Sequence, residues 1–117
     1  MALGNLFDIT INQGATFELT ITYKDSAGTA INLTGYTARM QVRETYSSSS
    51  TVVSLTNGSG ITLGGAAGTI AILISAATTE ALTAPFSGVY DLEIVSGGGV
   101  VTRLLQGAAT VSPEVTR

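Results

Sequence analysis

The sequence contains no cysteine, no histidine and no tryptophan among its 117 residues. Without cysteine it can form neither disulfides nor thiolate metal sites. Without cysteine and histidine together it lacks the usual ligands of zinc, copper and haem, so only oxygen atoms could hold a metal ion. Histidine is also the commonest general base near neutral pH. We therefore expect neither enzymatic activity nor a cofactor.

Charge is scarce as well. Only 11% of the residues are charged and the net charge is −3, whereas an average domain has about 25% charged residues. Five basic residues in an acidic chain do not supply the basic face that binds nucleic-acid phosphates. A surface so poor in charge is explained either by cover from other proteins or by abundant serine and threonine. The composition leaves both explanations open.

Long apolar runs are absent too, since none reaches 18 residues. No transmembrane helix and no membrane partner are therefore expected. Residues 1–5 lack the basic head and the apolar core of a signal peptide. We expect the chain to be made and used in the cytoplasm, or to leave the cell only as part of a particle.

Apolar and polar residues alternate along most of the sequence, which is the pattern of half-buried β-strands. One short helical turn is expected near 75–82, where Ser75 can cap an alanine-rich stretch. Gln106 and Gly107 predict a bulge within the last strand. The expected strands cover residues 6–12, 16–23, 37–44, 52–55, 61–63, 69–74, 90–94, 100–105 and 108–111.

About seven to nine short antiparallel strands, with turns every eight to twelve residues, are typical of an immunoglobulin-like β-sandwich. We therefore predict one all-β domain over residues 1–117. The Cys–Trp–Cys core of antibody domains is absent, so the prediction concerns the architecture alone. Pro113 cannot donate to a strand ladder, and residues 113–117 are expected to be a loose tail.

Three features could suggest chemistry. The glycines at 58–60 and 64–68 do not have phosphate-loop spacing and favour hairpin turns. Asp91 and Glu93 share the polar face of one strand, where solvated carboxylates are favoured over a weak calcium site. Arginines at 39, 43 and 103 are expected to pair with them across strands. The sole lysine, Lys24, lies in a turn, which argues against a Ser–Lys nucleophile.

Two long runs resemble a known family: GATFELTITYKDSAGTAINLTGYTARMQVR and DLEIVSGGGVVTRLLQGAATVSPEVTR. They resemble small structural proteins of tailed bacteriophages, which relate to the N-terminal Ig-like domain of upper baseplate proteins. The resemblance implies a non-enzymatic virion protein that is assembled in the host cytoplasm and binds other virion proteins. It would be a tail or baseplate adaptor or a capsid decoration subunit, as a homo-oligomer or in several copies. The stop at Arg117 favours a stand-alone decoration or connector subunit.

Two runs could provide a docking edge. Residues 6–12 carry Asp8 as their only charge, and residues 108–112 carry none, so both lack the usual protection of exposed strand edges. Either run could instead be an internal strand. If one of them docks on a neighbouring subunit, the interaction residues are expected to be Asp8, Thr10, Thr110, Pro113 and Val115.

An alternative function is a carbohydrate- or host-surface-binding Ig-like module. Such modules stack sugars on exposed aromatic rings. Tyr23 and Tyr90 fall on registers that face the core, which favours packing. Tyr46, on the serine-rich hairpin loop at 45–51, is the aromatic that we expect to be free, and it completes the set of candidate interaction residues.

Overall fold

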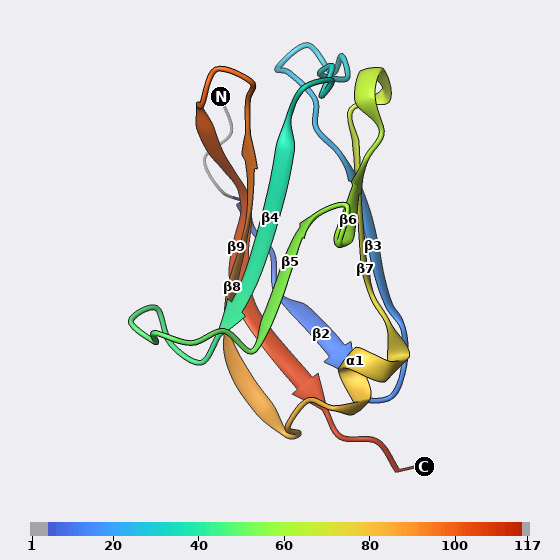
Figure 1. Ribbon diagram of the computed structural model, residues 1–117, viewed down its shortest axis with the longest axis vertical. Helices are drawn as coiled ribbons and strands as arrows, with labels where there is room; N and C mark the ends of the chain where they lie inside the picture. Colours follow the sequence, from blue (N-terminus) through green and yellow to red (C-terminus); the bar gives the residue numbers. More distant parts are fainter. Residues whose placement is uncertain (1–4, 116–117) are drawn as a thin grey trace.

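Residues 5–115 are described by the computed structural model, and they form nine strands and two short helical turns (Figure 1). The 3-10 turn is η1 (Gly65–Ala67) and the α-helical turn is α1 (Ala76–Glu80). The strands are β1 (Asn5–Leu6), β2 (Ile9–Asn12), β3 (Phe17–Thr22), β4 (Thr37–Arg43), β5 (Val53–Asn57), β6 (Gly60–Leu63), β7 (Thr69–Ile74), β8 (Phe86–Val95) and β9 (Val101–Ser112).

The strands pair in the order β1-β9-β8-β4-β5-β6-β7-β3, and β2 also pairs with β9. Figure 1 shows two layers, with β9, β8, β4 and β5 in one and β6, β7 and β3 in the other. The tight turn between β5 and β6 joins the layers into one continuous ladder. This arrangement is an immunoglobulin-like β-sandwich. The helical turn also forms where it was expected, and Ser75 Oγ accepts a hydrogen bond from the Thr78 amide.

The core lies between the layers and follows the predicted alternation. On β4, Ala38, Met40 and Val42 are buried while the residues between them face outward. The same alternation buries side chains on β7 and β8, whereas the residues at 17, 19 and 21 of β3 pack against the core while staying partly exposed. The remaining buried apolar residues on β7 and β8 are Ile70, Ile72, Ile74, Tyr90, Leu92 and Ile94.

The N-terminal strands depart from the prediction. Both β1 and β2 run parallel to β9, so the sandwich is not wholly antiparallel. β9 also continues for 12 residues, with β8 on one side and β2 on the other. The prediction that residues 108–112 could be a docking edge is therefore wrong. Among the described residues β2 pairs with β9 alone, so residues 9–12 do form an edge.

Gly107 allows this crowded arrangement instead of creating a bulge. A Cβ atom at this position would lie 2.7 Å from the carbonyl oxygen of Phe7 and 2.8 Å from Asp8 Oδ1. Such a contact is shorter than normal packing tolerates, so only glycine lets the N-terminal strand approach β9 this closely. The bulge predicted at 106–107 lies elsewhere on β9, at Leu104.

Candidate functional site

The bulge at Leu104 determines which side chains of β9 face outward. On β8, Leu92 pairs with Leu105 and Glu93 pairs with Arg103, so Leu104 is an extra residue without its own partner. A bulge of this kind re-aims the neighbouring side chains. Leu104 and Leu105 are both buried, and Arg103 and Gln106 therefore lie on the same outer face.

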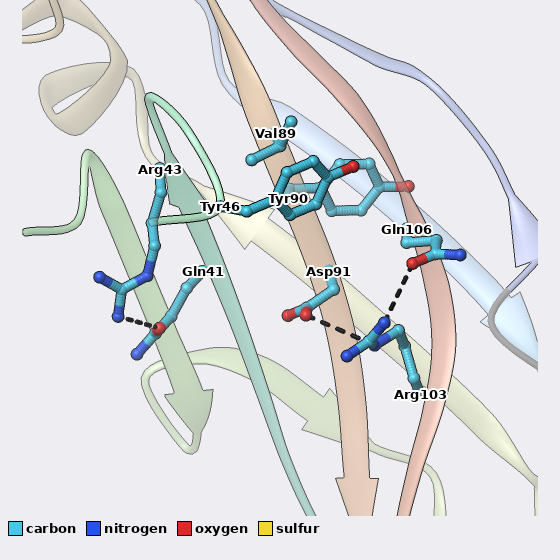
Figure 2. A pocket seen from close by; sticks show the side chains of 8 residues that line it. All are labelled: Gln41, Arg43, Tyr46, Val89, Tyr90, Asp91, Arg103 and Gln106. Carbon is cyan, nitrogen blue, oxygen red and sulfur yellow. Dashed lines mark hydrogen bonds and ion pairs between the residues drawn. The ribbon is translucent and has the colours of Figure 1, made fainter. Parts of the chain in front are cut away.

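Polar side chains line up across this outer face in three columns, from β4, β8 and β9 (Figure 2). Arg39 Nε lies 2.8 Å from Glu93 Oε1, and Arg103 Nε lies 3.6 Å from Asp91 Oδ2. These two cross-strand pairs confirm the predicted pairing. Arg43 was expected to join a carboxylate, but its Nη2 donates to Gln41 Oε1 at 2.9 Å instead.

Tyr46 reaches over this face from the loop that follows β4 (Figure 2). The loop begins with a turn in which the Thr45 amide donates to Ser48 Oγ and the Ser48 amide donates to the Thr45 carbonyl. Arg43 Nη1 also donates to the Ser48 carbonyl at 2.7 Å. These bonds fix the base of the loop, while the Tyr46 side chain remains exposed.

Below Tyr46 lies a shallow hollow of about 150 Å³. Three of the chain's five basic residues are on the outer face, and two of them border this hollow. Burial raises the pKa of Asp91, and the Glu93 carboxylate raises it further, while the three arginines act in the opposite direction. The hollow is lined by Gln41, Arg43, Tyr46, Val89, Tyr90, Asp91, Arg103 and Gln106.

A second candidate surface is the N-terminal edge, which we define as residues 6–12. Asp8 is exposed, but its Oδ1 accepts a hydrogen bond from the Ala108 amide at 3.0 Å. The Tyr90 hydroxyl donates to the carbonyl oxygen of Phe7. Burial, together with the Asp8 carboxylate, raises the pKa of Tyr90 to about 12. Because Asp8 accepts the Ala108 amide, its carboxylate takes the place of a backbone acceptor beside β9. Asp8 is thus already hydrogen-bonded within the domain.

The free side of β2 can be assigned from its neighbours. The amides of Phe7 and Gln13 both donate to β9 carbonyls. Because backbone groups alternate along a strand, the amides of Thr10 and Asn12 point away from β9. Thr10 is paired with Thr110, and both side chains are exposed.

The segment after β9 returns to the turn between β2 and β3. Gln13 Nε2 donates to the Leu82 carbonyl at 2.9 Å, and Gln13 Oε1 accepts from the Glu114 amide at 3.0 Å. Gln13 therefore holds the segment after β9 in place through its hydrogen bond with the Glu114 amide. Pro113 and Val115 remain exposed on either side of it, and the last two residues of the expected loose tail lie outside the described part.

Within residues 5–115, no three His, Cys, Asp or Glu residues are grouped so that they could hold a metal ion. No helix in the same range is long and apolar enough to cross a membrane.

The six residues proposed from the sequence fall into three groups. Asp8, Thr10 and Thr110 lie together where β2 meets β9, Pro113 and Val115 are exposed in the segment after β9, and Tyr46 belongs to the hollow. Sequence reasoning missed Gln41 and Gln106 as lining residues. A period-two pattern marks Gln41 as outward on its own strand, but it shows neither the bulge at Leu104 that turns Gln106 outward nor that two strands far apart in sequence bring both glutamines to one hollow.

No family model matches the chain, and no curated protein matches it. Among solved structures it is similar to the extracellular domain of the voltage-gated sodium channel beta4 subunit, whose parallel homodimers are described as explaining its role in cell–cell adhesion. The two sequences are 16% identical, the alignment covers 98% of each chain, and the TM-score is 0.49. A likeness this distant transfers no function.

Proposed function

We propose that the protein is a non-enzymatic structural subunit of a tailed-bacteriophage virion, and that a neighbouring virion protein pairs a strand with the free edge of β2. The observation that carries the docking mode is the outward direction of the Thr10 and Asn12 amides, which have no strand beside them among the described residues. Unpaired edge groups of this kind bind an added strand through main-chain hydrogen bonds.

The surroundings of the edge support the same proposal. Monomeric proteins usually protect an edge strand with lysine, proline or an inward charge. Residues 6–12 contain no lysine and no proline, and their one charge, Asp8, is bound to the Ala108 amide. Leu6 is 80% exposed and Phe7 is 45% exposed at the start of the edge, and Val115 is 93% exposed beyond its end. These apolar side chains lie at the two ends of the free edge, where a partner that pairs with β2 could cover them.

Membership of a phage particle rests on the resemblance of the two sequence runs to small phage structural proteins. In such a particle the neighbour is either another virion protein or a further copy of this chain. The shortage of charge agrees with a surface that other proteins cover in the assembled state.

Thr10→Pro tests the docking mode. The substitution removes the outward amide, and β2 should still pair with β9 because the amide of residue 10 does not take part in that ladder. Mass spectrometry of purified virions should find the wild-type chain at a fixed copy number and should find the Thr10→Pro variant at less than a tenth of it. The matched control, Thr10→Val, keeps the amide and should be incorporated normally.

Thermal melts of the isolated domain check that Thr10→Pro still folds. Thr10→Lys provides a second variant that places a charge at the edge without altering the backbone. Normal incorporation of both variants would overturn docking at β2, and virions that contain no wild-type chain would overturn the structural role itself.

A further inference from the structure

The hollow beneath Tyr46 has the size and the chemistry of a small ligand site, which the docking edge does not use. Its volume is about 150 Å³, whereas pockets for drug-sized ligands begin at about 300 Å³. It is also only partly enclosed, and the exposed Tyr46 side chain is one of the residues that border it (Figure 2). A single ring that remains attached to something outside the hollow fits these dimensions better than a buried molecule or a peptide chain.

An aromatic ring and planar polar groups lie next to each other here. The Tyr46 side chain is 82% exposed, and it borders the hollow together with Val89. An exposed aromatic face can pack against a ring that presents C–H groups on one side, and the phenol hydroxyl at its edge adds a polar contact. Sugars in the pyranose form present such a C–H face and surround it with hydroxyl groups.

The polar side chains that line the hollow can both donate hydrogen bonds to those hydroxyl groups and accept hydrogen bonds from them. Within the described residues, Asp91 Oδ1 accepts no hydrogen bond and Gln41 Nε2 donates none, so an acceptor and a donor are available. Arg43 has no carboxylate within ion-pair distance in the same part of the chain, and its guanidinium keeps donors that Gln41 and Ser48 do not use. Hydroxyl groups both donate and accept, so this mixture suits them better than it suits a simple anion.

The lining is also held in place before any ligand arrives. The Leu104 bulge aims Arg103 and Gln106 at the same face, and Arg103 Nη1 donates to Gln106 Oε1 at 3.1 Å. Arg43 is fixed between Gln41 and the base of the Tyr46 loop. Pre-positioned groups lose less conformational freedom on binding. We propose that this hollow binds one pyranose ring of a carbohydrate, stacked on Tyr46 and hydrogen-bonded to Gln41, Arg43 and Asp91.

The test uses the full chain, labelled with ¹⁵N, and a panel of methyl pyranosides of glucose, galactose, mannose, N-acetylglucosamine and glucuronic acid. At least one glycoside should shift the amide resonances of residues 41–48, 89–91 and 103–106 with a dissociation constant of about 1 mM, the range expected for one weakly buried ring. Tyr46→Ala should abolish these shifts. Tyr46→Phe, which keeps the ring, should bind within about threefold of the wild type, since a threefold change is only a small difference in free energy.

Two further variants separate recognition from folding. Asp91→Asn should weaken binding at least about tenfold, because the amide replaces one acceptor oxygen by a donor. Thr20→Ala, on the opposite layer, should bind as the wild type does. The proposal fails if no glycoside shifts these resonances at ten times the expected dissociation constant, or if Tyr46→Ala binds as tightly as the wild type. Because β2 does not line the hollow, a negative result in this test would not contradict docking at the edge of β2.

Discussion

Arg103 and Gln106 are three residues apart on β9, yet both lie on the outer face, and the Arg103 guanidinium donates to the Gln106 amide oxygen at 3.1 Å. In a regular strand, residues three apart point to opposite faces. The extra residue at Leu104 reverses the alternation between them. One irregularity of the backbone thus places two polar side chains beside the hollow and two consecutive leucines in the core.

The bulge predicts that both leucines support the fold. Leu104 is 5% exposed and Leu105 is 8% exposed, so Leu104→Ala and Leu105→Ala should each lower the free energy of unfolding by about 2–5 kcal/mol. In a regular strand one of the two would face solvent, and its truncation would cost little. Urea denaturation measures both values, with the exposed Val101→Ala as a control that should change stability by less than about 0.5 kcal/mol. A small effect at either leucine would contradict the bulge.

The raised pKa of Tyr90 predicts that the domain loses stability at alkaline pH. The Tyr90 pKa is raised to about 12 in the folded protein, whereas an unfolded tyrosine has a pKa of about 10. The folded state therefore holds this proton more tightly, and the stabilisation is complete below pH 10 and disappears as the pH rises through 12.

Tyr90→Phe has no proton to lose, so its stability should fall less between pH 10 and pH 12 than that of the wild type. At pH 7 it should already be about 1–3 kcal/mol less stable, because the Phe7 carbonyl loses its hydrogen-bond donor. Denaturant titrations at a series of pH values measure both effects. Parallel stability curves for the two proteins would show that Tyr90 does not titrate in this way.

The hydrogen bonds of the Gln13 side chain link the turn after β2 to the segment after β9, and this link should contribute to stability. Gln13→Ala removes one hydrogen bond to Leu82 and one from Glu114, and it should destabilise the domain by about 1–3 kcal/mol. The Glu114 amide should also exchange its hydrogen faster. Asn12→Ala, at the exposed neighbouring position, is the matched control and should leave both measurements unchanged. If Gln13→Ala and Asn12→Ala have the same stability and the same exchange rate, the Gln13 hydrogen bonds do not stabilise the domain.

The sequence predicted those parts of the fold that depend on local alternation. β7 has the predicted bounds, the inward residues of β4 are the ones expected, and the helical turn begins at its predicted cap, Ser75. Each of these features depends on side chains close together in the sequence, where the alternation of burial is directly visible.

The sequence did not predict how the terminal strands pair. Residues 6–12 and 108–112 show the same alternation whether their neighbours are parallel, antiparallel or absent, so the pattern alone left their edge status open. The bulge was likewise placed at Gly107, because glycine permits one there, whereas its true position follows from the register between β8 and β9. The hollow depends on both of these non-local facts. Tyr46 was predicted as a free aromatic residue and Asp91 with Arg103 as a cross-strand pair, but nothing in the sequence placed Gln41 and Gln106 beside them.

The parallel pairing of β2 with β9 also affects how the domain responds to mechanical force. When the chain is stretched between Asn5 and Val115, the two strands are drawn along each other in opposite directions. Their backbone hydrogen bonds lie across the direction of pulling, so they resist it together and must rupture together. An antiparallel terminal hairpin would instead peel open one bond at a time. We therefore expect the terminal strands to resist stretching from the two ends of the domain more strongly than such a hairpin would.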